Sequence, residues 1–496
     1  MARKTKLSTN WVIRFVPNDV WRCIFHVISE SSGHATPGIL GVLRASHVCS
    51  SWRNVTENAP ELWTNVVLEY CRRRKSIFPN VKLLSLFLSR SGNLPLTMEV
   101  TARKRPTSKE PLDVDALELF VGTMHRAKVL KVEIDALSNL CDYMEDIHSD
   151  DALVARVKPG LLLEKLEMSG GYESETSSAA LANLWHPAPS MRTLAFYAFR
   201  ADDFVGGANC YFLLSEEFPF QQITSLELTC PISHEGIYDL LPALPSLQSA
   251  ILNYIHDVNK TVQRAVELQK LQTLSLAGPS YALDGEPPSM MKILEFISTP
   301  ALTTLQLSFV GEWSSDSFKS FLSRAPTQIK KLHLDITEAT DDERIDCLMM
   351  LPSLLTLDLT SKASLLTDDT ESYLLEEDIM RAMTEWDDSR DQFVLCPHLV
   401  KLIIDYDTLD DTTTTRTAFV DMVESRWRRS SSGKGENRHF ELVLKRAGHL
   451  GDSPKTISEL MRLLLLRKAG LNLTIEPLTW LERLAGPTLP ALDNIY

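Results

Sequence analysis

A six-residue phrase, apolar at its first, fourth and sixth positions, recurs along the second part of this 496-residue chain. Its copies are LEKLEM from Leu163, MRTLAF from Met191, ITSLEL from Ile223, the weaker LQSAIL from Leu247, LQTLSL from Leu271, LTTLQL from Leu302, IKKLHL from Ile329, LLTLDL from Leu354 and LVKLII from Leu399. The start-to-start steps are 28, 32, 24, 24, 31, 27, 25 and 45 residues. Because strand side chains alternate between two faces, each phrase predicts a short strand with one apolar face. Recurrence at this period predicts stacked units, none of which is stable alone.

The segments between the phrases carry helical patterns: HEGIYDLLPAL, MMKILEFIS, SDSFKSFLSRA and DERIDCLMML. A proline often stands just before the next phrase, at Pro189, Pro245, Pro300, Pro326, Pro352 and Pro397. Strand, helix and proline-bearing turn in this order predict a right-handed coil of parallel strands. LPLTMEV from Leu94, AKVLKVEI from Ala127 and HFELVL from His439 are candidates for outer rungs of the same coil.

This pattern resembles the leucine-rich-repeat family, whose period is roughly 20–29 residues. The resemblance implies a solenoid with parallel strands on a concave face and helices outside. In the family an Asn or Cys stands eight residues after the first Leu; here those positions hold Gly171, Phe199, Pro231, Pro279, Val310, Thr337, Lys362 and Asp407. We therefore expect irregular turns. An ordinary α/β domain of parallel strands would also explain the phrases, but their number favours the solenoid.

Three later segments refine this expectation. The acidic stretch from Thr367 to Leu399 has Ile379, Met383 and Trp386 at helical spacing, which favours an inserted helix over an acidic peptide-binding tail. The stretch from Arg426 to His439 is polar and rich in Gly and Ser, which predicts a loop. SELMRLLLLRKAGLNLTIE then predicts a helix that ends near Gly470 and one last strand, with the leucines capping the stack.

The N-terminal stretch FVPNDVWRCIFHVISE, Phe15 to Glu30, predicts an amphipathic helix. Pro17 suits the first helical position and Asp19 the first turn, where the helix dipole favours negative charge. The apolar positions form one wide face, made by Val20, Trp21, Ile24, Phe25 and Ile28. A second helical pattern opens at Ile39 and continues through Leu40, Leu43, Val48, Trp52 and Val55. Pro60 ends it, and ELWTNVVLE predicts a strand.

The pairs and single residues of this region resemble an F-box over Trp11 to Trp63: Val16-Pro17, Ile24-Phe25, Leu40, Leu43-Arg44, Val48-Cys49, Trp52-Arg53, Pro60 and Leu62-Trp63. Val16 replaces the usual Leu, and the loop Ser29 to Gly38 is somewhat long. The family implies a helical module that docks onto a Skp1-like adaptor and, through it, a cullin. The implied adaptor-binding residues are Val16, Pro17, Val20, Ile24, Phe25, Ile28, Leu40, Leu43, Val48, Trp52, Leu62 and Trp63.

Two readings of these apolar residues remain open. They could form only the core of a helical cap on the repeats. A helical module of about fifty residues cannot bury all its apolar groups, so we expect some of them to face a partner. Trp is strongly enriched among interface anchors, which favours adaptor docking.

We predict an α/β chain with an all-α F-box module at 11–63, a linking segment with the first irregular repeats at 64–160, and an irregular leucine-rich-repeat solenoid with a C-terminal cap at 161–496. The second, third and fifth residues of each phrase are free to face the concave side. The candidates for target binding are Lys165, Glu167, Arg192, Glu227, Gln248, Gln272, Gln306, Lys331, His333, Asp358 and Lys401. Nine strands about 4.8 Å apart give a floor of roughly 40 Å, enough for a protein interface of about 800 Å² per side.

Composition excludes several other functions. The net charge of -14 and pI near 5.4 argue against nucleic acid as the main partner. The eight cysteines show neither zinc spacing nor a disulfide framework, which favours free thiols in a reducing compartment. Neither a secretory signal nor an apolar run of about 18 residues is present, so we expect no membrane partner and a cytoplasmic or nuclear location.

No catalytic motif, metal cluster or cofactor fingerprint is evident, and we expect a non-catalytic chain without a cofactor. His333 and Asp335 share one strand face and suggest a base with its orienter, but a solvated polar face explains them as well. Asp341, Asp342 and Glu343 are placed where a helix should begin, where acids belong for dipole reasons. The combined pattern predicts the substrate-recognition subunit of a Skp1–cullin–F-box ubiquitin ligase. The alternative is a non-catalytic repeat scaffold whose helices only cap the solenoid.

Overall fold

A computed structural model of the chain describes residues 16–30, 38–71, 76–102, 114–133, 160–169, 188–197, 219–229, 232–233, 237–238, 240–253, 255–256, 265–278, 291–308, 313–324, 328–335, 339–360, 377–405, 413–432, 440–445 and 454–476. The chain divides into two compact units, Met1–Cys230 and Pro231–Tyr496, which we call unit 1 and unit 2. The predicted start at Trp11 lies outside the described residues. The predicted domain boundaries at residues 63 and 160 stay predictions.

Unit 1 begins with a helical module, residues 16–63. It consists of α2 (Asn18–Glu30), α3 (Gly38–Ser46), α4 (Ser50–Glu57) and the short helix η1 (Pro60–Trp63). The strands follow as β1 (Asn65–Cys71), β2 (Ser76–Phe78), β3 (Leu96–Ala102), β4 (Ala127–Glu133), β5 (Lys165–Ser169), β6 (Thr193–Tyr197) and β7 (Ser225–Thr229). They lie in the order β2-β1-β3-β4-β5-β6-β7, parallel except for β2. The helices of this part are α5 (Val81–Arg90), α6 (Val114–Thr123), η2 (Met124–Arg126) and η5 (Phe220–Gln222).

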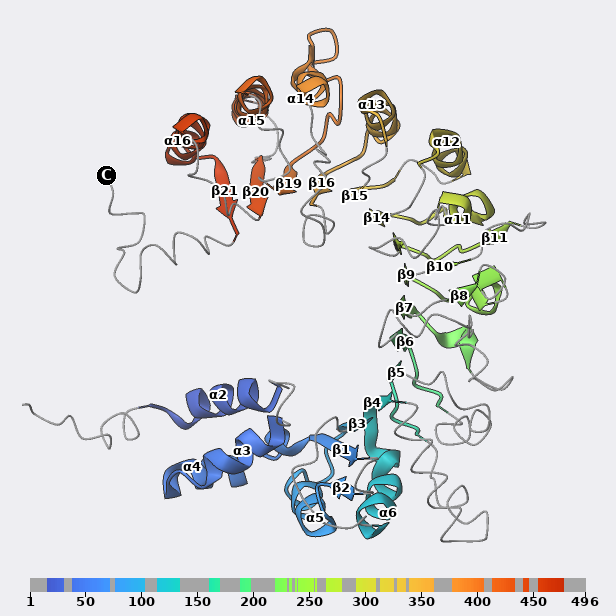
Figure 1. Cartoon of the computed structure of the whole chain (residues 1–496), viewed down its shortest axis with the longest axis vertical. Coiled ribbons are helices and arrows are strands. Elements are labelled where there is room, and N and C mark those ends of the chain that lie inside the picture. Colours follow the sequence, from blue (N-terminus) through green and yellow to red (C-terminus); the bar gives the residue numbers. More distant parts are fainter. Residues whose placement is uncertain are drawn as a thin grey trace, which may run out of the picture. The chain divides into compact units, whose positions relative to one another are not determined.

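Unit 2 continues the alternation of strand and helix. Its main strands are β9 (Ser249–Asn253), β12 (Thr273–Ala277), β14 (Thr304–Ser308), β15 (Lys331–Asp335), β16 (Thr356–Leu359), β19 (Lys401–Asp405), β20 (Glu441–Lys445) and β21 (Asn472–Ile475), parallel and in this spatial order. The helices are η6 (Leu241–Ala243), α11 (Met291–Phe296), α12 (Ser315–Arg324), α13 (Asp341–Met349), α14 (Glu377–Thr384), α15 (Thr413–Ser432) and α16 (Pro454–Lys468). Figure 1 shows α12 to α16 in one row along one side of the strands.

Three further strand pairs form small sheets of their own. They are β8 (Ile232–Ser233) with β10 (Ile255–His256), β11 (Val266–Glu267) with β13 (Ile297–Ser298), and β17 (Trp386–Asp387) with β18 (Gln392–Phe393). The first two pairs are parallel, and β17–β18 is antiparallel.

The register of the parallel strands confirms the predicted core. The fourth residues of successive phrases are direct neighbours, as Leu166, Leu194 and Leu226 are. All three are 0% exposed. Buried and partly exposed side chains alternate along these strands, so each strand has one face in the core and one facing outward. The segments expected as outer rungs form β3, β4 and β20. A parallel strand ladder with a helix beside most rungs is a leucine-rich-repeat-like arrangement.

A tight turn before the strand explains the recurring prolines. The backbone N–H of the first apolar residue of a phrase donates to the carbonyl three residues earlier, as from Met191 to Ala188 at 3.1 Å and from Leu354 to Leu351 at 3.1 Å. Pro189 and Pro352 therefore take the second position of a four-residue turn, which the fixed φ of proline favours. In this chain the turn that leads into each rung therefore comes before the strand. In the leucine-rich-repeat family the Asn or Cys of the turn comes after the strand.

The structure corrects one prediction in the helical module. The single helix expected from Ile39 to Val55 is two helices, α3 and α4. The break falls at His47–Cys49, where Cys49 is extended and its thiol accepts the backbone N–H of Trp52 at 3.4 Å. A side-chain cap of this kind ends one helical segment and starts another without disturbing the apolar spacing.

Two more corrections concern the long rung. The inserted helix is present as α14, with Ile379 and Met383 buried, but Trp386 lies in β17. Helix α15 runs through Arg426 to Ser432, where a loop was expected. Arg426 is only 1% exposed and donates to the carbonyls of Met383, Leu395 and Cys396 at 2.9, 2.6 and 3.1 Å. These acceptors belong to the inserted segment, which is distant from Arg426 in the sequence. The residues around Arg426 show only their polarity, and for that reason they resemble a loop. The predicted final helix and strand are confirmed as α16 and β21.

Candidate functional sites: the helical module and the strand floor

Helix α2 contributes its inner face to the core of the module. Trp21 and Phe25 are 8% and 0% exposed, and one helical turn separates them. The ring of Trp52, from α4, lies 4.7 Å from Trp21 and 5.2 Å from Phe25 between centroids. Aromatic pairs at such distances add to the free energy of burial. The three rings therefore hold α2 and α4 together.

A second apolar face of α2 is exposed. Val20, Ile24 and Val27, which we call the α2 stripe, are 46%, 41% and 67% exposed. Their spacing of four and three residues places them on one side of the helix. Val48, at the break between α3 and α4, is also 60% exposed. Helix α2 is thus apolar over a wider arc than the module covers.

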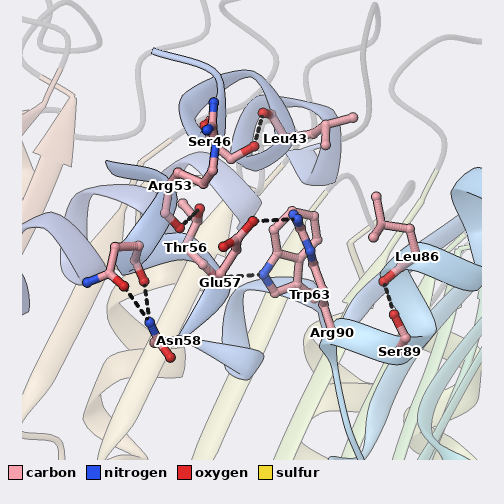
Figure 2. Close-up of polar contacts among 11 residues, drawn as sticks. Leu43, Ser46, Arg53, Thr56, Glu57, Asn58, Trp63, Leu86, Ser89 and Arg90 are labelled. Carbon is pink, nitrogen blue, oxygen red and sulfur yellow. Dashed lines mark hydrogen bonds and ion pairs between the residues drawn. The ribbon is translucent and has the colours of Figure 1, made fainter. Parts of the chain in front are cut away.

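Trp63 anchors the module to the first repeat helix (Figure 2). Its indole Nε1–H donates to the carbonyl of Thr56 at 2.8 Å, and its side chain is 0% exposed. The guanidinium of Arg90, from α5, lies 4.5 Å from the Trp63 ring centroid and forms an ion pair with Glu57 at 3.0 Å. Phe87 of α5 also belongs to the module core. The module and α5 therefore share one core.

The predicted adaptor-binding residues fall into three groups. Pro17, Val20, Ile24 and Val48 are exposed. Half-buried residues that pack against the core are Val16, Ile28, Leu40, Leu43 and Trp52. Phe25, Leu62 and Trp63 are buried, with exposures of 0%, 1% and 0%, so in this structure they support the surface rather than reach a partner. Val27 was missed, although its position three residues after Ile24 indicated the exposed stripe.

The outward face of unit 1 is a floor of interleaved charges. Lys165 and Glu167 point outward from β5, and Glu227 from β7, while Arg192 lies one residue before β6. The ammonium of Lys131, from β4, lies 3.1 Å from the carboxylate of Glu167. Burial alone would raise the pKa of Glu167, but hydrogen bonds from Lys165 and Lys131 hold it below its usual value.

A second set of contacts crosses the same floor. The Tyr197 hydroxyl donates to Glu227 at 2.9 Å, and the Thr101 hydroxyl donates to Glu133 at 2.8 Å. Burial, with the Glu227 carboxylate, raises the pKa of Tyr197. Burial also raises the pKa of Glu99, and the neighbouring carboxylates of Glu167 and Glu133 raise it further against the effect of Lys131. The carboxylates of Glu133, Glu167 and Glu227 are thus held by residues of neighbouring rungs, whereas Glu99 is repelled by two of them.

The outward face of unit 2 carries the remaining predicted target-binding residues. Gln306, Lys331, His333, Asp358 and Lys401 point outward from β14, β15, β16 and β19. Gln248 and Gln272 are exposed but lie one residue before their strands, where the Gln248 carbonyl accepts from Gln272 at 2.8 Å. The ammonium of Lys401 pairs with Glu441 at 2.9 Å. Whether any of these residues binds a target stays a prediction.

His333 lies at the centre of a polar trio on three adjacent strands. Its Nε2 is 3.1 Å from the Ser308 hydroxyl, and its Nδ1 is 3.3 Å from the Asp358 carboxylate. The acid that orients the imidazole is thus Asp358 of the next strand. The sequence had suggested Asp335, which lies on the same strand as His333. Burial favours a raised pKa for Asp358, but hydrogen bonds from His333 and Thr360 lower it. Ser308 is only 5% exposed, and all three strands are paired, so the trio forms a polar link across three strands on the outward face of the sheet.

The acidic run at Asp341 forms the expected helix start. Thr340 and Glu343 make a capping box, in which the Thr340 hydroxyl accepts the Glu343 backbone N–H at 3.3 Å and Glu343 accepts that of Thr340 at 3.0 Å. Over the described ranges, no group of three or more His, Cys, Asp or Glu residues could hold a metal ion. In that same part of the chain, no helix combines the length and apolarity needed to cross a bilayer.

No family model and no curated protein matches the chain. Among solved structures, it is similar to the leucine-rich repeat-containing protein LegL7 from Legionella pneumophila, with 14% identity over 80% of this chain and 97% of that chain and a TM-score of 0.33. It is also similar to a chain in the yeast Rad7 and Elc1 complex, with 13% identity over 80% of this chain and 90% of that chain and a TM-score of 0.33. Likeness at this level says nothing about what this chain binds.

Proposed function

We propose that this chain is the substrate-recognition subunit of a Skp1–cullin–F-box type ubiquitin ligase. The helical module binds a Skp1-like adaptor and, through it, a cullin, and the strand floor binds a target protein. The chain itself makes and breaks no bond. It holds the target near the transfer site, which raises the effective concentration of target lysines there.

The observation that carries the proposal is the exposed α2 stripe. Three aliphatic side chains of one helix face solvent, although the same helix has a well-packed inner face. Covering exposed apolar area is favourable by about 25 cal/mol per Å². Contiguous apolar surface of this kind marks interaction sites on soluble proteins. Val20 and Ile24 are among the residues that the F-box resemblance assigns to the adaptor, and Val27 extends the same side of the helix.

A second candidate function rests on the shared core of the module and α5. Phe87 and the partly buried Leu83 pack against the same cluster as Trp21 and Phe25. A module that only caps the first repeat of a scaffold would need this contact and no adaptor. The cap and the adaptor site differ in the role of the exposed stripe, so substitutions there distinguish them.

The test is co-purification of the full chain with a Skp1-like adaptor. The double variant Val20→Ser/Ile24→Ser should lose adaptor binding at least tenfold while its thermal unfolding stays that of the parent chain. His26→Ser, an exposed polar change on the same helix, is the matched control and should bind normally. Failure of the intact chain to bind, or equal binding by the double variant, would leave the capping function as the better account.

A further inference from the structure

A groove lies between two neighbouring helices of unit 2, α14 and α15. It has a volume of about 560 Å³ and is lined by side chains of both helices: Glu377, Arg381, Thr384 and Glu385 on one side, and Thr417, Ala418 and Asp421 on the other. The first set runs from the first residue of α14 to the residue after its last, so the groove follows the whole helix, a length of about 12 Å. Its volume is typical of sites that bind ligands.

Short side chains explain why the groove is open. Thr384, Thr417 and Ala418 all line it, at positions where longer side chains would fill the space between two packed helices. The helices are nevertheless joined in the core, because the buried Arg426 of α15 donates to the carbonyl of Met383 of α14 at 2.9 Å. The groove is therefore part of a packed helix pair.

The groove carries more acid than base. It is lined by the carboxylates of Glu377, Glu385 and Asp421 and by one guanidinium, that of Arg381, which pairs with Glu377 of its own helix. Asp421 is held by Arg462 of α16 at 2.8 Å. Among the described residues, the exposed carboxylate of Glu385 has no ion-pair partner. Glu385 also follows the C-terminal end of α14, where the helix dipole favours a cation.

Neighbouring helix pairs supply their own cation. Lys319 of α12 pairs with Asp346 of α13 at 3.2 Å, and Arg462 of α16 pairs with Asp421 of α15. Between α14 and α15 the cation that lines the groove is Arg381, and it pairs within its own helix. A cation from another molecule would complete this junction as the lysine and arginine complete the other two.

We propose that this groove binds a basic segment of a partner protein. The aliphatic stem of a lysine or arginine side chain lies along Thr384 and Ala418, and its charged head pairs with Glu385; both side chains combine an apolar stem with a cationic end. Helices α12 to α16 lie in one row along one side of the strands, so the groove is separate from the strand floor (Figure 1). It does not depend on adaptor binding, so it can hold or fail independently of the proposed function.

The test measures binding of a fluorescent peptide of alternating arginine and alanine to the full chain, by anisotropy. Glu385→Lys should weaken binding by about fivefold or more, because it replaces an attraction by a repulsion. The matched control is Glu267→Lys, which makes the same change of charge at an exposed position of β11, outside the groove. This control should bind the peptide as the parent chain does.

A second variant tests the shape of the groove without changing its charge. Ala418→Leu places a larger side chain in the groove and should also weaken binding, with thermal unfolding as the check on its fold. If it does not fold, Glu385→Lys carries the test alone, because it alters an exposed side chain.

Three outcomes would overturn the proposal. The first is that the parent chain does not bind the peptide. The second is an equal loss in Glu385→Lys and Glu267→Lys, which would show attraction only to the net charge of -14. The third is a dimer in sedimentation that Glu385→Lys abolishes, because a second copy of the chain would then occupy the groove.

Discussion

The α2 stripe and the floor of unit 1 are both exposed, yet they are built from opposite kinds of side chain. The stripe consists of three aliphatic residues without a covering surface. On the floor, carboxylates are already bound, as Glu167 is by Lys131 at 3.1 Å and Glu227 by Tyr197 at 2.9 Å. Covering the stripe is favourable whatever the detailed fit, because apolar burial is non-directional. Covering the floor exchanges existing polar contacts for new ones, which rewards only a well-matched partner.

Affinity and selectivity should therefore come from different surfaces of unit 1. An apolar stripe on a well-packed module suits a constant partner, such as the adaptor proposed above. A charged floor that spans several rungs suits a partner chosen by its charge pattern. This difference requires a tightly packed core in the module and, on the floor, carboxylates that are already bound within the chain. Substitutions at both places test these two requirements.

The largest effect is expected at Trp63. Trp63→Ala removes a fully buried ring and the Nε1 donor to Thr56, and should lower the free energy of unfolding by about 3–5 kcal/mol. Denaturant unfolding of the full chain, followed by circular dichroism, measures the loss. Trp63→Phe keeps most of the ring volume and should cost less. Unchanged stability in the alanine variant would mean that the module core does not rest on this residue.

A smaller loss is expected at Gly41, where α3 passes close to α2. A Cβ at this position would lie 2.5 Å from Cγ2 of Ile28, so Gly41→Ala should cost about 1–3 kcal/mol. Gly122→Ala is the matched control, because nothing lies within 4 Å of its Cβ, and it should leave stability unchanged or slightly raised. Equal behaviour of the two variants in thermal unfolding would contradict the close packing of α2 on α3.

On the floor of unit 2, Asp358→Asn should cost about 1 kcal/mol at neutral pH, because the carboxylate holds His333 and Thr360. The pKa of Asp358 is lowered by folding, so its stabilising contribution is complete above the ordinary pKa of an aspartate and is lost as pH falls through the lowered value. The difference between parent and variant in unfolding free energy should therefore shrink on acidification. A difference that stays constant between pH 7 and pH 3 would refute the Asp358 carboxylate as its source.

The smallest effect is expected at Glu99, and its sign is reversed. Burial and the carboxylates of Glu167 and Glu133 raise the pKa of Glu99, so its ionised form opposes folding above the ordinary pKa of a glutamate. Glu99→Gln should stabilise the chain by a fraction of a kcal/mol at pH 7, since solvent screens a partly exposed group. The gain should vanish below the ordinary pKa. Glu164→Gln is the control, because it removes only the exposed ion pair of Glu164 with Lys128 at 3.2 Å and should leave stability unchanged or slightly lowered. A loss of stability in Glu99→Gln would contradict the repulsion of Glu99 by Glu167 and Glu133.

Sequence patterns predicted most of the repeated elements because the apolar period is a local property. In every phrase from Leu163 to Leu399 a strand begins at the third residue, and the segments at Leu94, Ala127 and His439 proved to be rungs. The capping box at Thr340 was equally readable, since it depends on residues three positions apart. The break between α3 and α4 was missed because apolar spacing continues across it.

The candidate sites could be predicted only in part. Helical spacing marked one wide apolar face on α2, but it could not divide that face into Phe25, which is buried, and Ile24, which is exposed. That division depends on where α4 and α5 pack. Lys165 and Glu167, which pair with each other, were placed on the outward face correctly by alternation, whereas Lys131, the second partner of Glu167, comes from a neighbouring rung.

The sequence alone determined the alternation of strand and helix, the inward face of each strand and the amphipathic character of α2, because these follow from residue spacing along one segment. Only the tertiary structure decided that Arg426 is buried in a helix, that Trp63 joins the module to α5, and that Asp358 orients His333. Each of these contacts joins residues at least 25 positions apart. Such contacts form only when whole rungs stack, and no local pattern encodes which side chains then meet.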